Sequence, residues 1–484
     1  MRVLPPSALV YVFLAARNLA IRSKESLVVT IEKNLYKNVL CIYPYKNGTP
    51  KKQYCPPIGL EYITAVLEDL TGKVTLIDMR FESDLDKYFN QELVDLACVS
   101  ISWDYQRDAA LNIIAGFPAG VKVVAGGRYA TTYVTELFAA SPNLDIIVRG
   151  DGEEIIRDIA SGLPLAEIAG ISYRKDGGVI HNPSRDLGCL NDKIYPNRKL
   201  RRSNYRLLYK NIDLGLGMDF ISTSRGCPYN CKFCTFTNNP LGQKRGWSAR
   251  SARSVVEELK TVPAEFIFVV DDNFAVDMKR VEEICDLIIA AGIKKTFAVS
   301  LRLDVYKYPQ VLKKMFAAGF KILSIGIESA QNKTLKAMEK GFDTALAEKA
   351  FAEIGKINFY VHGYFIVGCI GESEPEMLAI AAFAKRLSLD SISLSLLRTE
   401  KYSPLNEVIA QSAGYQVSGN DMVYSADCSV EKLKSIRHRI SKSYYNFSTW
   451  LRITKKIFTA HLISVPHLAR LIAVLCFRGV ISGR

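Results

Sequence analysis

The stretch Ser224-Arg-Gly-Cys-Pro-Tyr-Asn-Cys-Lys-Phe-Cys234 holds three cysteines, Cys227, Cys231 and Cys234, with Cx3Cx2C spacing. Three thiolates in one loop suit an iron–sulfur cluster, and three ligands for four irons leave one iron open to a small-molecule chelator. A structural zinc site needs a fourth ligand. Cys189 and Cys285 are candidates for it, but neither stands in a paired CxxC motif. The spacing therefore favours a cluster over zinc.

A series of alternating apolar runs and helical stretches extends from this loop toward the C-terminus. Such alternation is typical of parallel strands joined by helices, and six repeats predict a partial barrel of six strands instead of a complete eight-stranded one. The predicted strands lie near residues 219–223, 266–270, 296–300, 322–327, 361–367 and 391–397.

A second α/β series precedes the loop. Helical spacing at residues 59–70 and 131–140 separates its apolar runs, so the pattern predicts an open doubly wound, Rossmann-like domain, and ligands of such sheets bind at the carboxyl ends of the strands. The predicted strands lie near residues 39–43, 74–77, 97–101, 121–125 and 145–148.

The fold class is therefore α/β, with five predicted segments. They are an apolar extension (1–36), the doubly wound domain (37–160), a linker with a hairpin at 171–180 (161–213), the partial barrel (214–430) and a basic helical region (431–484).

The cysteine loop and the strand ends after it resemble the radical SAM enzymes, over about residues 214–400. That family's signature is a Cx3CxφC loop with an aromatic residue at φ, here Phe233. The resemblance implies a [4Fe-4S] cluster whose open iron binds S-adenosylmethionine (SAM), and reductive cleavage of SAM to a 5′-deoxyadenosyl radical. The residues implied as SAM contacts are Phe233, Asp271, Asp272, Ser300, Arg302, Glu328 and Gly368.

These contacts also have a physical rationale of their own. Carboxylates at strand ends can accept hydrogen bonds from an ammonium group or ribose hydroxyls, and a glycine lets the backbone approach a planar base. Each pair also has an alternative role. Asp271 and Asp272 are candidates for a helix cap, and Gly368 and Gly371 for an ordinary turn.

The first domain resembles the cobalamin-binding domain that precedes many radical SAM barrels. The alternative is a domain that keeps this fold without the ligand. No histidine precedes His181, so cobalt has no histidine ligand from this domain. Trp103, Tyr105 and Tyr54 are candidates for covering the lower face of the cofactor, or they pack against the barrel. The residues implied as cobalamin contacts are Ser100, Ser102, Gly126, Gly127, Thr131, Gly150, Gly152 and Glu153.

Together the two resemblances imply a cobalamin-dependent radical SAM methyltransferase acting on an unactivated carbon. Arg398, Glu400 and Tyr402, after the sixth strand, are candidates for the substrate mouth or for surface roles. The alternative is the same cofactors with non-methylating chemistry, namely cyclisation, ring contraction or oxidation, on a lipid or tetrapyrrole-like substrate. A methylthiotransferase is disfavoured because the first domain has no second three-cysteine cluster. A non-catalytic corrinoid or cluster protein is disfavoured by the series of SAM-site residues.

Composition and charge indicate a folded protein with a basic tail. The 484 residues are 49% hydrophobic and 23% charged, which excludes a mainly disordered chain. Eleven cysteines, an odd number, favour a reducing, cytoplasmic compartment over a disulfide framework. The net charge is +14, and most of it lies near the C-terminus. The segment from Lys432 to Arg484 contains eleven Lys and Arg residues and no Asp or Glu. The apolar runs at residues 3–16 and 471–477 are shorter than the ~20 residues that a spanning helix needs.

These features suggest the partners. We expect a one-electron reductant such as flavodoxin or ferredoxin, and a small-molecule or lipid substrate, or else an acidic protein substrate. The basic, aromatic tail suggests peripheral membrane contact. Nucleic acid is disfavoured because the sequence contains no recognised RNA-binding module.

Overall fold

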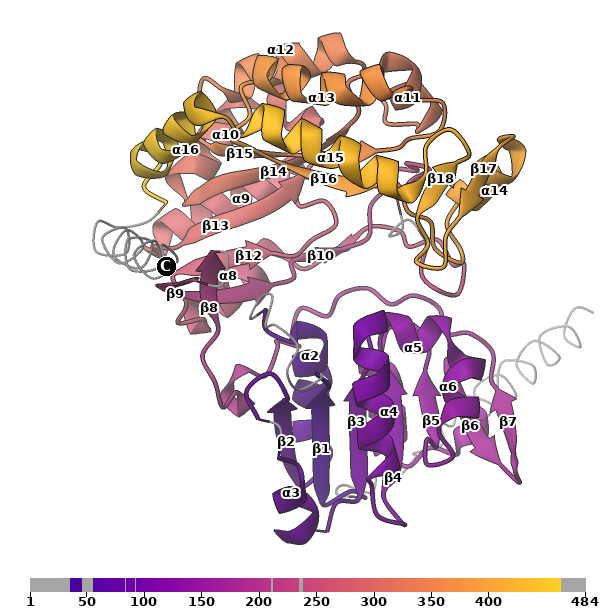
Figure 1. Ribbon diagram of the computed structural model, residues 1–484. Helices are drawn as coiled ribbons and strands as arrows, with labels where there is room; N and C mark the ends of the chain where they lie inside the picture. The colour runs from indigo at the N-terminus through magenta and orange to yellow at the C-terminus, as the bar shows by residue number, and fades with distance from the viewer. Residues whose placement is uncertain are drawn as a thin grey trace, which may run out of the picture.

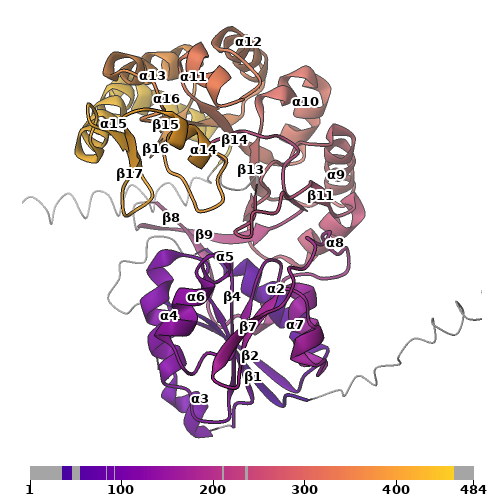
Figure 2. The ribbon, with the colours of Figure 1, turned by 90° about the vertical axis from the view of Figure 1, so that its right-hand side faces the viewer.

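The computed structural model describes residues 35–45, 55–82, 84–91, 93–209, 212–234 and 238–462. Its described part contains two seven-stranded sheets, one in each half of the molecule (Figure 1). The first half is drawn in indigo and purple, and the second half lies above it with its helices on the outer side (Figures 1 and 2).

The first sheet has the strand order β2-β1-β3-β4-β5-β6-β7, and its first five strands are parallel. This confirms the doubly wound prediction, because the order in which strands are added to the sheet reverses between β1 and β3, while the strands themselves stay parallel. The five parallel strands are β1 (Asn38–Tyr43), β2 (Lys73–Asp78), β3 (Leu96–Ser100), β4 (Lys122–Gly126) and β5 (Ile146–Val148).

Both faces of this sheet are covered by helices, which explains why its strands are apolar throughout. Along β1, Val39 and Cys41 point into one core while Leu40 and Ile42 point into the other. The first core is closed by α2 (Ile58–Glu68) and α7 (Glu153–Ala160), and the second by α4 (Arg107–Ala115), α5 (Arg128–Thr132) and α6 (Val134–Ala140). A short helix, α3 (Asp86–Gln91), follows β2.

The hairpin expected in the linker belongs to the first sheet, which corrects the predicted segment 161–213. Strands β6 (Ile171–Lys175) and β7 (Gly178–His181) add antiparallel to the edge at β5. The turn takes positive φ at Asp176 (49°) and Gly177 (79°), as a two-residue hairpin turn requires. The connection between the two sheets therefore runs only from residue 182 to residue 205.

The second sheet has the order β16-β15-β14-β13-β12-β9-β8. Its six parallel strands are the six predicted ones, and the sheet stays open, which confirms a partial barrel. The seventh strand, β8 (Arg206–Tyr209), pairs antiparallel with β9. The parallel strands are β9 (Ile212–Ile221), β12 (Phe266–Val269), β13 (Thr296–Leu301), β14 (Phe320–Glu328), β15 (Tyr360–Val367) and β16 (Ser391–Leu396).

Helices on the outer side of this sheet form the largest core with it (Figure 2). They are α8 (Ala252–Thr261), α9 (Met278–Ala290), α10 (Pro309–Ala317), α12 (Thr344–Ile354) and α13 (Glu374–Arg386). Smaller elements at the rim are α11 (Asn332–Ala337), α14 (Leu405–Gln411), β17 (Tyr415–Val417) and β18 (Val423–Ser425).

The predicted C-terminal helices are present as α15 (Val430–Tyr444) and α16 (Phe447–Thr459). Leu433, Ile436 and Ile440 of α15 join the barrel core. Within the described residues, no helix has both the length and the apolar character to cross a bilayer. The apolar runs at 3–16 and 471–477 lie outside the described residues.

Arginines of the inter-sheet connection hold the two halves together. Arg201 hydrogen-bonds Glu61 of α2 at 2.6 and 2.7 Å and Asp219 of β9 at 2.7 and 2.9 Å. Arg198 joins Asp219 to Glu258 of α8. Because both partners of each pair are largely buried, losing one would leave an uncompensated charge. This network joins α2 of the first domain to β9 and α8 of the barrel.

Candidate active site between the two sheets

A cavity of about 650 Å³ lies where the carboxyl ends of the strands of the two sheets face each other. Parallel strands of an α/β sheet place ligands at this edge. The first domain contributes Ser102, Trp103, Arg128, Tyr129 and Tyr133, among others, to the wall. The barrel contributes Cys227, Cys231 and Cys234, together with Arg398, Glu400 and Tyr402 after β16.

The cysteine loop is held in place by the carboxylates that end β12. Asp271 accepts hydrogen bonds from the Thr223 N–H (2.7 Å), the Thr223 hydroxyl (2.5 Å) and the Ser224 hydroxyl (2.6 Å). Asp272 accepts from the Gly226 N–H at 2.8 Å. Burial raises the pKa of both carboxyl groups, and these hydrogen bonds oppose the rise.

Gly226 is required by the shape of the loop. Its φ is +82°, and a Cβ there would lie 2.3 Å from the Gly246 carbonyl oxygen. The two arms of the loop pair as β10 (Ser224–Arg225) and β11 (Ser248–Ala249). The loop therefore begins at a backbone position that only glycine fits.

The cysteines sit beside a cation. Arg302, after β13, places Nη1 3.4 Å from the Sγ of Cys231, and its guanidinium lies 3.7 Å from the centre of the Tyr229 ring. Burial raises the pKa of Cys227, while a backbone hydrogen bond and Arg302 lower it in part. Positive charge beside thiolates favours the anionic form that a metal needs.

The donor set fits a cluster better than one zinc ion. Cys227, Cys231 and Cys234 belong to one loop and all line the cavity, as the three protein ligands of a cluster would. The candidate fourth zinc ligands are elsewhere, since Cys285 is buried in the barrel core and Cys189 lines another pocket.

Five of the seven predicted SAM contacts line the cavity, namely Phe233, Asp272, Ser300, Arg302 and Glu328. Asp271 does not line it, because its carboxylate is turned to Thr223 and Ser224. It does not cap α9 either, since Asp277 is that cap. Asp271 therefore holds the loop.

Gly368 also lies away from the cavity. Its φ is +87°, and a Cβ would lie 2.7 Å from Leu433 Cδ2. The positive φ agrees with the alternative of an ordinary turn, and the glycine also permits close packing of the end of β15 on α15. The glycine in the cavity wall is Gly326 of β14, where a Cβ would lie 2.3 Å from Glu328 Oε1.

Lys340 is a cavity residue that sequence analysis missed. Its Nζ donates to Glu328 Oε1 at 2.8 Å and lies 5.2 Å from the centre of the Phe233 ring. Its carbonyl oxygen accepts from Arg302 Nη2 at 2.6 Å. Lys340 stands between α11 and α12 without any local sequence signal, so only the fold reveals it.

A second cavity, of about 210 Å³, lies at the carboxyl ends of β3, β4 and β5. Of the eight predicted cobalamin contacts, all but Thr131 line it. Gly127 has φ +110°, and a Cβ would lie 2.7 Å from the Ile101 carbonyl oxygen. A Cβ at Gly152 would lie 2.9 Å from Ile63 Cδ1. Side chains at these glycines would disturb the pocket wall, so the residues present fit a ligand that closely approaches the backbone.

Two predicted cobalamin residues have other partners. Thr131 donates to the Gly127 carbonyl (2.9 Å) and accepts from the Gly150 N–H (3.2 Å), so it joins the two glycine turns behind the pocket. Glu153 accepts a 2.5 Å hydrogen bond from Arg225. Burial raises the pKa of Glu153, but the charge and hydrogen bond of Arg225 outweigh burial and hold it below its usual value.

The three candidates for covering the lower face of the cobalamin differ in where they lie. Trp103 lines the large cavity and is half exposed. Tyr105 does not line it and lies edge-on to Tyr45, with ring centres 6.3 Å apart. Tyr54 lies outside the described residues. No histidine of the described chain lines either cavity.

Family comparisons match the two halves separately. A model of the Radical SAM superfamily matches residues 221–384, and a model of the B12 binding domain matches residues 49–160. The chain belongs to the B12-binding radical SAM enzymes. As such an enzyme it uses a [4Fe-4S] cluster, SAM and cobalamin. The residues that line the two cavities are compatible with these groups.

This B12-binding radical SAM enzyme is 28% identical to a protein of Pyrococcus horikoshii named an uncharacterized methyltransferase, over 84% of this chain and 91% of that one. It is 26% identical to the anaerobic magnesium-protoporphyrin IX monomethyl ester cyclase of Synechocystis sp., over 62% of each chain. A solved structure of the radical SAM methyltransferase TsrM from Kitasatospora setae shares the fold, with a TM-score of 0.64 at 19% identity over 84% and 81% of the chains.

Proposed function

We propose that this protein methylates an unactivated carbon of its substrate. The observation that carries the proposal is the shared cavity. Cys231 and Arg302 form part of one wall and Ser102 and Trp103 part of another, and Ser102 also borders the smaller pocket. The relative named a methyltransferase, which matches over most of both chains, supports it.

The cofactors supply the difficult chemistry, which is hydrogen abstraction from carbon by way of SAM cleavage and methyl donation by way of cobalamin. The chain's own residues bind the cofactors and the substrate and orient them. Arg302 sets positive charge beside Cys231, and Lys340, near the Phe233 ring, is paired with Glu328. The glycine turns at Gly127 and Gly152 let the first domain approach its ligand closely. No general base is needed because the substrate loses a hydrogen atom, not a proton.

The net reaction fixes a stoichiometry. A substrate C–H bond is replaced by C–CH3, and 5′-deoxyadenosine keeps the abstracted hydrogen. One SAM is reduced to methionine and 5′-deoxyadenosine, and a second becomes S-adenosylhomocysteine. Two electrons from the reductant balance the sum. We propose a flavodoxin- or ferredoxin-like protein as the one-electron donor.

We propose a small-molecule or lipid substrate. Aromatic side chains, including Trp103, Tyr129, Tyr364 and Tyr402, share the cavity wall with Arg128 and Arg398. This mixture suits an amphiphilic molecule with an apolar body and a polar end.

Cyclisation without methyl transfer is the second candidate, favoured by the relative named a cyclase. The test is an anaerobic incubation of cluster-reconstituted, cobalamin-loaded protein with a low-potential reductant and SAM carrying a CD3 group. Methylation predicts CD3 on the protein-bound cobalamin together with 5′-deoxyadenosine. The Cys227→Ala, Cys231→Ala, Cys234→Ala variant is expected to lose its iron and its 5′-deoxyadenosine. Wild-type 5′-deoxyadenosine without CD3 on cobalamin would overturn methylation in favour of cyclisation.

A further inference from the structure

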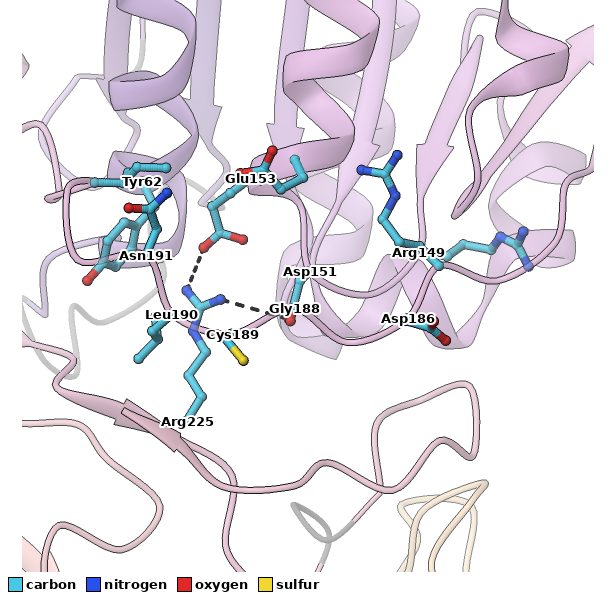
Figure 3. Close-up of a pocket in the computed structure, with 13 residues that line it drawn as sticks. Tyr62, Arg149, Asp151, Glu153, Asp186, Gly188, Cys189, Leu190, Asn191 and Arg225 are labelled. Atoms are coloured by element: carbon cyan, nitrogen blue, oxygen red, sulfur yellow. Dashed lines mark hydrogen bonds and ion pairs between the residues drawn. The ribbon is translucent and has the colours of Figure 1, made fainter. Parts of the chain in front are cut away.

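Both arms of the cysteine loop carry an arginine that pairs with one acidic turn of the first domain, at Asp151 and Glu153. Arg225, on β10, places Nη2 2.5 Å from Glu153 Oε1 and Nη1 4.0 Å from Asp151 Oδ1. Arg245, on the arm that leads to β11, donates to Asp151 Oδ1 at 2.5 Å. Figure 3 shows the Arg225 guanidinium pointing at both carboxylates.

The same turn forms part of the cobalamin pocket. Asp151, Gly152, Glu153 and Arg225 all line the 210 Å³ cavity. The Oδ2 atom of Asp151 is buried and has no hydrogen-bond partner within the described part of the chain. A buried, unpaired carboxylate oxygen is costly, and a donor on a bound ligand would remove that cost. Cobalamin carries primary amide groups around its ring, which are donors of this kind.

The acidic turn is thus bonded to the cysteine loop on one side and lines the cobalamin pocket on the other. Arg225 stands only two residues before Cys227. All four side chains are partly buried, with exposures between 14% and 26%, so these pairs are stronger than surface ion pairs.

We propose that Arg225 and Arg245 are positioning residues that couple cobalamin binding to the retention of the cluster. A ligand that hydrogen-bonds Asp151 orders the acidic turn. The ordered turn then holds both arms of the cysteine loop through Arg225 and Arg245. The coupling concerns binding alone, so it stands whether the enzyme methylates or cyclises.

The test is the rate at which a chelator removes iron from the reconstituted protein, with and without hydroxocobalamin. We expect cobalamin to slow iron loss in wild type by about fivefold or more, the lower end of the usual strength of coupling between sites. The double variant Arg225→Met, Arg245→Met is expected to lose most of that protection, and Arg225→Lys, Arg245→Lys to regain part of it. Arg202→Met is the matched control, because it removes a more exposed pair with Glu82 at 3.5 Å, away from the loop.

Linkage supplies a second readout. If cobalamin stabilises the bound cluster at equilibrium, the cluster must in turn tighten cobalamin binding, and the cobalamin affinity of the triple Cys→Ala variant measures this effect. Asp151→Asn, which keeps the shape of the side chain, tests the turn if the Met variants fold poorly. Equal protection by cobalamin in wild type and in the arginine variants would overturn the coupling, as would the absence of protection in wild type.

A separate observation concerns α16, whose outer face is apolar and exposed. Phe447 and Leu451 are 84% and 62% exposed, and Trp450 and Phe458 are also exposed, at spacings of three and four residues along one face. The opposite face packs inward through Thr449 and Ile453. The helix lies at the edge of the barrel half, away from the first domain (Figure 1).

Charge identifies the occupant of this face. Lys455 is exposed on the same helix, and the sequence from Lys432 to Arg484 carries eleven basic and no acidic residues. An amphipathic helix with aromatic residues and lysines suits the surface of an anionic membrane. We propose that α16 docks the protein on anionic lipid.

Vesicle sedimentation tests this docking. We expect the protein to pellet with vesicles of phosphatidylglycerol and phosphatidylcholine but not with phosphatidylcholine alone. Phe447→Ser, Leu451→Ser should weaken binding about tenfold. Leu93→Ser is the matched control, because Leu93 is 81% exposed on the first domain. Equal pelleting of all variants, or pelleting that does not depend on lipid charge, would overturn the assignment.

Discussion

Arg302 reaches from the end of β13 to within 3.4 Å of the Cys231 Sγ, and the same guanidinium donates to the Lys340 carbonyl at 2.6 Å. One side chain thus connects a cysteine of the loop to the segment between α11 and α12. The position of this charge beside the cysteines leads to the first prediction.

Replacing Arg302 by Gln should lower the reduction potential of the cluster. A nearby positive charge favours the reduced, more negative state, and its loss should shift the midpoint by tens of millivolts at the effective dielectric of a partly solvated site. A potentiometric titration followed by EPR measures the shift. Arg302→Lys keeps the charge and should stay close to wild type. A midpoint that is the same in the Gln variant would refute this electrostatic role.

The Glu328–Lys340 pair is buried on both sides, so removing one partner should cost more than removing both. Lys340→Met leaves Glu328 unpaired and should destabilise the fold by about 3 kcal/mol. Adding Glu328→Gln should recover much of that loss. Thermal unfolding of the cofactor-free protein measures both variants. If the double variant is as unstable as the sum of the single ones, the two side chains do not act as a pair.

His362 of β15 should make stability depend on pH. Burial lowers its pKa to about 4, and its ring nitrogens lie 2.6 and 3.0 Å from the Ser391 and Ser393 hydroxyls. The imidazole is neutral in the folded protein but takes up a proton in the unfolded chain below about pH 6.5. The stability that neutral His362 contributes is therefore fully present above about pH 6.5. It is lost as the pH falls toward 4, and the loss in the free energy of unfolding is up to about 3 kcal/mol.

The measurement for His362 is the melting temperature of the cofactor-free protein between pH 7.5 and pH 4.5. His362→Gln should show a shallower decline than wild type over that interval. Parallel curves for the two proteins would assign the acid sensitivity to other groups.

Gly127→Ala should weaken cobalamin binding by about tenfold or more. The new Cβ would meet the Ile101 carbonyl oxygen at 2.7 Å and the Ser102 Oγ at 2.8 Å, and so push the pocket wall inward. Cobalt content after anaerobic loading reports the loss. Gly120→Ala is the control, because Gly120 also has a positive φ (+95°) but a Cβ there meets no atom within 4 Å. An equal loss of cobalt in both variants would show that backbone strain, and not the contact of the Cβ with the pocket wall, weakens binding.

Much of the site could be predicted from the sequence because its signals are local. Cys227, Cys231 and Cys234 occupy one loop, and the glycine turns at Gly126–Gly127 and Gly150–Gly152 directly follow apolar strands. The carboxyl ends of parallel strands meet at one edge, so the order of strands and polar residues along the chain places these groups together.

The sequence does not indicate where a residue at a strand end points, because its side chain can turn either way. Asp271 and Asp272 are neighbours on one strand end, yet Asp271 faces Thr223 and Ser224 while Asp272 lines the cavity. Gly368 and Gly326 both follow the pattern of a glycine near a strand end, but only Gly326 borders the cavity because α15 covers Gly368. Residue type does not distinguish these cases.

The sequence by itself determined the two α/β domains, the open barrel and the cluster loop, because strand periodicity and cysteine spacing act over a few residues. Only the tertiary structure decided which charges meet. Arg225 and Glu153 are 72 residues apart in the chain, and Arg245 and Asp151 are 94 apart. Such pairs depend on how one sheet docks on the other, and a long-range ion pair leaves no pattern in either segment that forms it.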